Sequence, residues 1–209
     1  MLDHNKLVFI YVITTVVICI SQYAETSPTA QCCIFNHPQV LDFPIYLRDR
    51  WEAREPKKTP ERLTIDPAPY IIIHHSDTPG CEDFDSCSKR IRSIQNHHMD
   101  VNGWDDIGYN ILIGGDGGMY EGRELHIRGA HSPDYNNRSV GICFIGDFQS
   151  KLPNSKAINT AKQLITLFKN GIVLTSNYTL LGHRQTRATD CPGDALYNEI
   201  KTWSNWKDI

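Results

Sequence analysis

The sequence predicts an α/β protein with a mixed central β-sheet covered by about three helices. Two observations lead to this prediction. Short runs of β-branched residues are bounded by turn residues, as in buried strands, and other segments repeat apolar residues every three or four positions, as in amphipathic helices. Their order along the chain is strand, helix, strands, helix, strand, helix, which favours layers of helices on a sheet. The length of 209 residues allows one domain of ordinary size with an extension.

The first half of the chain contains most of the predicted strands. Residues 70–74 (YIIIH) form a buried strand that ends at the turn SDTPG, and residues 88–99 form an amphipathic helix. A hairpin follows, with its strands in 107–113 and 119–123 around the turn GDGG. Residues 139–145 form a further strand. The strand at 70–74 therefore delivers a pair of histidines to its end.

The second half contains the longest predicted helix, which begins at Asn154 or Ser155 as its cap and ends near Gly171. Its apolar face consists of Ala157, Ile158, Ala161, Leu164, Ile165, Phe168 and Ile172. A short strand at 178–181 and a final helix from residue 194 to about 203 complete the predicted elements.

The N-terminus indicates the compartment. Residues 7–20 form an apolar run of fourteen, whereas a helix that crosses a bilayer needs about 20 such residues. We expect residues 1–24 to be a signal peptide, cleaved between 22 and 30, and the protein to be secreted without a membrane anchor. A short membrane anchor is the alternative. The net charge of −3, with Lys and Arg scattered along the chain, gives no electrostatic footprint for nucleic acid.

Secretion places the cysteines in an oxidising environment. Cys81 and Cys87 enclose the polar loop EDFDS, and we expect a disulfide bond between them. Cys143 lies in the apolar stretch SVGICFIG and is expected to be a buried, inert thiol. Cys32 and Cys33 are adjacent, so a bond between them is not expected, and their partners stay open.

A pair of motifs offers metal ligands. His183 precedes Cys191 by eight residues, with a polar loop between them, and the strand-end histidines at 74 and 75 offer a third donor. An imidazole and a thiolate suit zinc, and three protein ligands with a fourth position open to water are typical of catalytic zinc sites. The pair at 183 and 191 taken alone also fits an ordinary loop without a metal.

Four long motifs carry a resemblance to a known family. They are YIIIHHSDTP, QNHHMDVNGWDDIGYNILIGGDGGMYEGR, GAHSPDYNNRSVGICFIGDF and GHRQTRATDCPGDALYNEIKTW. In this order they resemble the peptidoglycan recognition protein domain of animals, which is related to phage lysozyme-type zinc amidases. The resemblance implies the type 2 amidase fold over a domain at 50–206, preceded by an N-terminal segment at 25–49.

The resemblance also implies roles for individual residues. The zinc ligands of amidase members fall on His74, His183 and Cys191, and two further positions, Tyr109 and Thr189, orient the zinc-bound water or steady the tetrahedral intermediate. The implied activity is that of a zinc-dependent N-acetylmuramoyl-L-alanine amidase of innate immunity. Such an enzyme hydrolyses the amide between the lactyl group of N-acetylmuramic acid and L-alanine.

The resemblance assigns a ligand groove as well. Gly103, Trp104 and Arg123 match members that prefer peptidoglycan with diaminopimelate stems, and an arginine pairs readily with the extra carboxylate of diaminopimelate. The other groove positions are His98, His131 and Asn136. The expected partners are bacterial peptidoglycan and muramyl peptides. Glu124 stands beside Arg123 where many members have glycine, and it offers a competing carboxylate for that arginine.

A second function stays open at this point. The alternative to an enzyme is a non-catalytic peptidoglycan sensor that activates an immune signalling pathway. Members that only bind their ligand commonly lack the metal cysteine, so Cys191 favours the enzyme. The oligomeric state, and the use of the N-glycosylation motifs at Asn137 and Asn177, are not determined by the sequence.

Overall fold

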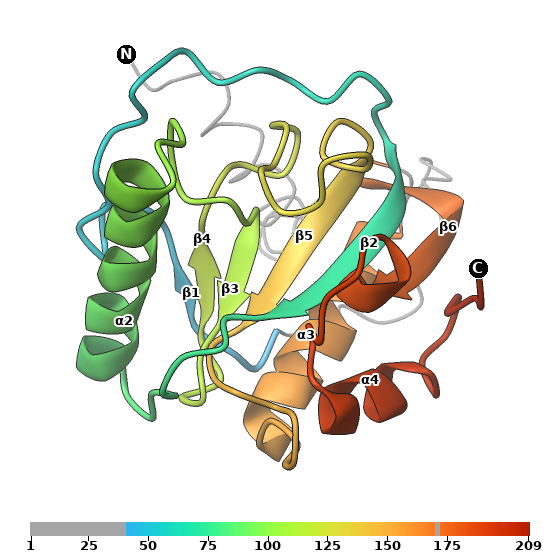
Figure 1. Ribbon diagram of the computed structural model, residues 1–209. Helices are drawn as coiled ribbons and strands as arrows, with labels where there is room; N and C mark the ends of the chain where they lie inside the picture. Colours follow the sequence, from blue (N-terminus) through green and yellow to red (C-terminus); the bar gives the residue numbers. More distant parts are fainter. Residues whose placement is uncertain (1–40, 170–171) are drawn as a thin grey trace, which may run out of the picture. The chain divides into compact units, whose positions relative to one another are not determined.

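The computed structural model describes residues 41–169 and 172–209. The compact unit Phe43–Ile209 holds a six-stranded mixed sheet and three α-helices, which confirms the predicted fold class (Figure 1). The predicted signal peptide, Cys32 and Cys33 lie outside the described residues. Within the described ranges, none of the helices has the length and apolar character needed to cross a membrane.

The sheet has the strand order β1-β4-β3-β5-β2-β6. The strands are β1 (Ile45–Tyr46), β2 (Ala68–His75), β3 (Ile111–Ile113), β4 (Met119–Glu121), β5 (Ser139–Phe144) and β6 (Leu174–Gly182). The helices are α2 (Phe84–Asn96), α3 (Ser155–Phe168) and α4 (Asp194–Ile200), with a π-helical turn η1 (His97–Val101) and a 3-10 turn η2 (His183–Gln185).

Four neighbouring strands run parallel, from β3 through β5 and β2 to β6. β3 and β4 form the predicted antiparallel hairpin, and β1 adds a parallel edge strand next to β4. The sequence did not predict β1, because two residues carry no periodicity and their partners, Met119 and Tyr120, lie far along the chain. The sheet therefore extends into the range 25–49.

The register of the sheet separates its two faces. Leu112, Cys143 and His74 are neighbours across β3, β5 and β2, so they share one face. Leu112 and Cys143 belong to the apolar cluster that also contains Ile91 and Ile94 of α2. Gly182 pairs with Ile73, whose side chain points to the face opposite that of His74. A Cβ on Gly182 would overlap Tyr197 of α4, so α4 lies on that opposite face. His74 thus emerges on the face that α2 covers.

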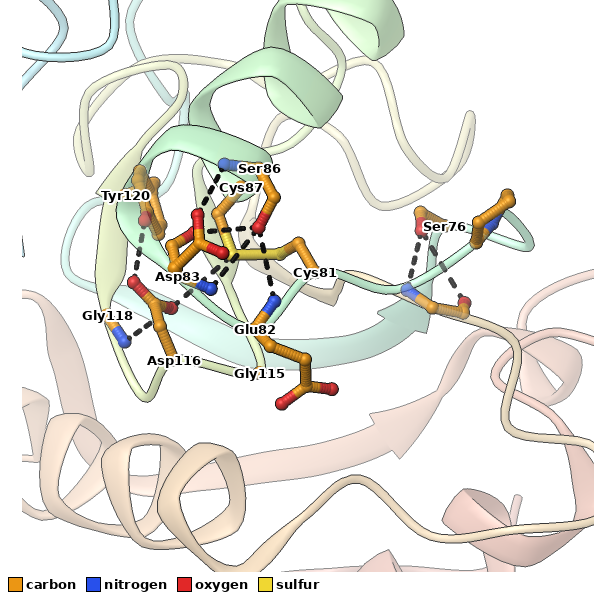
Figure 2. The surroundings of a disulfide bond; sticks show 12 residues. Ser76, Cys81, Glu82, Asp83, Ser86, Cys87, Gly115, Asp116, Gly118 and Tyr120 are labelled. Atoms are coloured by element: carbon orange, nitrogen blue, oxygen red, sulfur yellow. Dashed lines mark hydrogen bonds between the residues drawn. A yellow bond between two sulfur atoms is a disulfide. The ribbon is translucent and has the colours of Figure 1, made fainter.

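Helix α2 begins earlier than predicted. The sequence placed the helix at 88–99, whereas it spans Phe84–Asn96 and continues into η1. The side chain of Asp83 caps the helix by accepting a hydrogen bond from the backbone N–H of Ser86 (Figure 2). In return, the hydroxyl oxygen of Ser86 accepts a hydrogen bond from the backbone N–H of Asp83. This capping box starts the helix inside the stretch taken as a polar loop. The disulfide between Cys81 and Cys87 joins the preceding turn to the first turn of this helix.

Other boundaries also differ from the sequence prediction. Ile172 was expected on the apolar face of the long helix, but α3 ends at Phe168 and Ile172 is 50% exposed. The final helix ends at Ile200 rather than near residue 203. Strand β6 begins at Leu174, four residues before the predicted start, because the polar residues that follow Leu174 gave no strand signal. The cap of α3 is Asn154, one of the two predicted residues.

Candidate functional site

The predicted ligands meet at the carboxyl ends of two parallel strands. His74 lies near the end of β2, and His183 directly follows β6, which pairs with β2 up to the contact between Ile73 and Gly182. Parallel strands end at the same edge of a sheet, so both imidazoles reach one point. Cys191 lies in the loop between η2 and α4. The structure thus brings the three residues together from three segments.

Their atoms are close enough to share one metal ion. One ligand atom from each of His74, His183 and Cys191 lies within 4.8 Å of the other two. The Sγ of Cys191 is 3.7 Å from Nδ1 of His74. In a tetrahedral zinc site the ligand bond lengths place a sulfur and a nitrogen ligand about 3.6 Å apart. The pair of atoms therefore already stands at the spacing that such a site needs.

His183 supplies an independent test of the fit. Both of its ring nitrogens are buried, and within the described part of the chain neither has a hydrogen-bond partner. A buried polar atom without a partner is costly, and native structures keep few of them. A metal ion would use the lone pair of one of these nitrogens. The donor set of two imidazoles and one thiolate also matches catalytic zinc sites.

Burial sets the protonation states of these ligands. It lowers the pKa of His183 to about 4 and that of His74 well below its usual value, so both rings are neutral at pH 7. Burial also raises the pKa of the Cys191 thiol to about 12. The backbone N–H of His75 donates to its sulfur at 3.4 Å. The histidines are thus ready to bind a cation, whereas the thiol must first lose its proton.

Tyr109 and Thr189 each contact a residue of this cluster. The ring of Tyr109 is 5.3 Å from that of His74, centroid to centroid, and burial raises the pKa of its phenol well above the usual value. The phenol therefore stays protonated and keeps a hydrogen to donate. The hydroxyl of Thr189 accepts a hydrogen bond from the backbone N–H of Cys191 at 3.3 Å, which orders the loop that carries the thiol.

A cavity of about 410 Å³ gathers four of the six predicted groove residues. Gly103, Trp104, Arg123 and Asn136 all line it. Gly103 has a φ of +71°, a backbone conformation that glycine adopts without strain, and it lies in the turn that leads to Trp104.

Backbone carbonyl oxygens orient Arg123 in the cavity. Its guanidinium donates to the backbone carbonyl oxygens of Ile107 at 2.7 Å and Arg128 at 2.9 Å. The other cationic side chains of the cavity lie in ion pairs with carboxylates, namely Arg48 with Asp106, Lys58 with Asp105 and Arg128 with Glu61. The carbonyl oxygens orient the charge of Arg123 without neutralising it. Glu124 lines the same cavity.

The other two groove residues lie between the cavity and the ligand cluster. His98 accepts a hydrogen bond from the backbone N–H of Gly108, and its ring is 4.6 Å from Trp104 and 5.5 Å from Tyr109. Burial lowers its pKa to about 4. His131 is 6% exposed and lies 3.0 Å from Nε2 of His74, on the side away from Cys191. A chain of aromatic rings thus connects the cavity with the candidate metal ligands.

The sequence missed part of the cavity wall. The segment 56–61 lines it and is held by hydrogen bonds from the backbone N–H of Lys57 to Asp105 and from that of Arg128 to Glu61. Arg48 and Asp106, which form an ion pair at 2.9 Å, line the same cavity. The proline-rich composition of this segment indicated a loop laid over the domain, but nothing local in it indicated which surface it covers.

The fold and the candidate site together define a class of protein. A mixed sheet whose parallel strands bring two histidines and a cysteine to one edge, beside a polar cavity, has the architecture of the type 2 amidases. The chain belongs to the N-acetylmuramoyl-L-alanine amidase family, whose sequence pattern matches residues 65–194. This membership confirms the resemblance that the motifs indicated.

The relatives specify the branch of the family. Peptidoglycan-recognition protein 2 of Holotrichia diomphalia is 43% identical over 159 residues, which cover 76% of this chain and 84% of that protein. The N-acetylmuramoyl-L-alanine amidase of Sus scrofa is 42% identical over 162 residues, or 76% of this chain and 27% of that protein. The crystal structure of peptidoglycan recognition protein LE in complex with tracheal cytotoxin, a monomeric diaminopimelic acid-type peptidoglycan, matches with a TM-score of 0.77 at 38% identity. The match covers 79% of this chain and 96% of that one.

Proposed function

We propose that this protein is a secreted, zinc-dependent N-acetylmuramoyl-L-alanine amidase of innate immunity. It binds bacterial peptidoglycan and hydrolyses the amide between the lactyl group of N-acetylmuramic acid and L-alanine. The observation that carries this proposal is the cluster of His74, His183 and Cys191, in which the buried ring nitrogens of His183 have no hydrogen-bond partner among the described residues. The amidase of Sus scrofa, 42% identical, supports the same reaction.

His74, His183 and Cys191 would hold the zinc ion. When bound, zinc polarises the scissile carbonyl and lowers the pKa of a coordinated water toward about 7. The protonated phenol of Tyr109 donates a hydrogen bond to the oxygen of the scissile carbonyl as negative charge develops on it. Thr189 keeps the loop of Cys191 in place through its hydrogen bond to the backbone. Catalysis then depends on a donor and a ligand set that are fixed before the substrate arrives.

The cavity takes the stem peptide of the substrate. Arg123 faces a site whose other cationic side chains are already paired with carboxylates, and a guanidinium binds a carboxylate through two parallel hydrogen bonds. Diaminopimelate carries one carboxylate more than lysine, so diaminopimelate-type stems gain this contact. The complex of recognition protein LE with a diaminopimelic acid-type peptidoglycan supports the assignment.

One experiment tests the reaction and the preference together. The purified protein is incubated with diaminopimelate-type and lysine-type peptidoglycan, untreated, after chelation, and with zinc restored. We expect chelator-sensitive release of stem peptides that zinc restores and that is faster on the diaminopimelate polymer. Binding without release, even with zinc, would refute the enzyme and support the peptidoglycan sensor instead.

A variant of the thiol ligand provides the matched control. Cys191→Ser removes the soft ligand while it keeps a side chain of nearly the same size, so the fold and the cavity stay intact. We expect peptidoglycan binding without hydrolysis. A variant that hydrolyses at the rate of the parent protein contradicts the zinc mechanism.

A further inference from the structure

His131 contacts a candidate metal ligand without being one. Its Nδ1 lies 3.0 Å from Nε2 of His74, whose other nitrogen faces Cys191. On its far side, Nε2 of His131 lies 3.4 Å from the hydroxyl of Ser139. That hydroxyl donates to the backbone carbonyl of Tyr135 at 2.7 Å. All three side chains are buried, with exposures of 6% for His131, 1% for His74 and none for Ser139.

The direction of this chain of hydrogen bonds is fixed at its far end. A carbonyl oxygen only accepts, so the single hydroxyl proton of Ser139 points at Tyr135. The oxygen of Ser139 is then an acceptor toward His131, which must carry its proton on Nε2. Nδ1 of His131 keeps its lone pair and accepts from Nε2–H of His74. His74 is left with an unprotonated Nδ1, the nitrogen that faces Cys191.

The surrounding backbone packs closely against the ring of His131. A Cβ on Gly141 would lie 2.6 Å from the ring of His131, and a Cβ on Gly129 would also overlap it. The side-chain oxygen of Asn136 accepts from the backbone N–H groups of His131 and Ser132, both at 2.8 Å. Two glycines thus make room for the ring, and an asparagine holds the backbone that carries it.

We infer that His131 is a positioning residue which, with Ser139 behind it, holds His74 in the tautomer that offers Nδ1 to a metal ion. The inference rests on the zinc site of the proposed function. The partners that orient histidine ligands in metal sites work in this way, since the hydrogen bond at one ring nitrogen determines which nitrogen binds the metal. It gives His131 a role different from the substrate contact that the family resemblance implied.

Nitrogen NMR of the histidine rings tests the tautomer without any metal. Protonated and unprotonated ring nitrogens differ widely in chemical shift, so the metal-stripped protein reports the tautomer of His74 directly. A His74→Asn variant assigns its signals. We expect the proton on Nε2 in the parent protein and a mixture of both tautomers in Ser139→Ala. Ser88→Ala is the matched control, because Ser88 is also buried and its hydroxyl has no partner among the described residues.

Either of two results would overturn the inference. A proton on Nδ1 of His74 in the parent protein contradicts the direction of the chain. An unchanged tautomer in Ser139→Ala contradicts the role of Ser139 at its end.

Zinc affinity, measured by competition with a chelator, provides the second readout. His131→Leu removes the acceptor for His74, and we expect zinc to bind about 10- to 100-fold more weakly. His131→Gln keeps an amide oxygen that accepts the same hydrogen bond, so most of the affinity returns. Thermal unfolding of the metal-free variants shows that both fold. Equal losses in two folded variants would mean that the ring only fills space.

The two readouts separate this inference from the proposed function. If the parent protein itself fails to bind zinc while its tautomer is as expected, the zinc enzyme is refuted and the hydrogen-bond chain stands. If zinc binds, but Ser139→Ala leaves the tautomer of His74 unchanged and His131→Leu leaves the zinc affinity unchanged, the inference fails and the enzyme stands.

Discussion

Zinc uptake by this protein should depend on pH through the proton of the Cys191 thiol. Burial raises the pKa of the Cys191 thiol to about 12, so at pH 5 to 8 the metal-free protein holds that proton and must release it when the thiolate binds zinc. His183, with a pKa of about 4, is already neutral in this range, as is His74. The histidine ligands therefore release no protons.

The size of this pH dependence follows from the number of protons that the ligands release. One proton released per zinc makes binding about tenfold tighter for each unit of rising pH, or about 1.4 kcal/mol per unit. Between pH 5 and pH 6, below the range in which a zinc-bound water ionises, the affinity should thus increase about tenfold; at higher pH the bound water releases a further proton and the slope becomes steeper. The sign is set by the thiol, because zinc competes with the proton for the same sulfur.

Competition with a chelator at several pH values measures the slope, once the pH dependence of the chelator itself is calibrated. Calorimetry in two buffers with different ionisation enthalpies counts the released protons independently. Cys143→Ala removes the other free thiol of the described residues and should leave the slope unchanged. A slope near zero between pH 5 and pH 6 would show that the thiol of Cys191 is already ionised, and a slope of two or three in that range would show that the histidines are protonated. Either result refutes the reasoning from burial.

Three other changes have expected outcomes. Tyr109→Phe should lower kcat about 10²- to 10³-fold with little change in peptidoglycan binding, because it removes the phenolic donor; an unchanged kcat in steady-state hydrolysis contradicts that role. Arg123→Gln should weaken binding of diaminopimelate-type muramyl peptides more than that of lysine-type peptides in calorimetric titrations, and equal losses argue against the carboxylate contact. Asn154→Ala should lower the free energy of unfolding by about 1 kcal/mol in urea titrations, since the side chain caps α3. Asn154→Ser keeps a capping oxygen and should lose less.

The local signals in the chain were sufficient for most of the architecture. The β-branched run that ends at His74 predicted the strand β2, and the Gly-Asp-Gly-Gly turn predicted the hairpin of β3 and β4. These features are set by a few neighbouring residues, which is why they can be recognised without the fold. The helix start at Phe84 was missed for a local reason as well. The capping box of Asp83 and Ser86 is present in the sequence, but the prediction treated it as part of a polar loop.

The candidate site, like the fold, was predicted only in part from the sequence. The types of ligand, two histidines and one cysteine, follow from motifs that stand in the chain, and so does the presence of Arg123. Their convergence depends on the parallel pairing of β2 with β6, which joins Ile73 to Gly182 across more than a hundred residues. A strand sequence determines which of its faces is apolar but not its neighbour in the sheet.

The sequence by itself thus determined the family, the order of the elements and the chemistry of the ligands. Only the tertiary structure decided that the segment 56–61 forms a wall of the cavity, that β1 joins the sheet, and that His131 lies behind His74 with Ser139 as its own support. The physical reason is that each of these contacts joins distant residues, and the local sequence around one residue does not predict the other. These contacts form only when the sheet and the core pack. Many side chains have similar local sequences around them, and packing determines which of them meet.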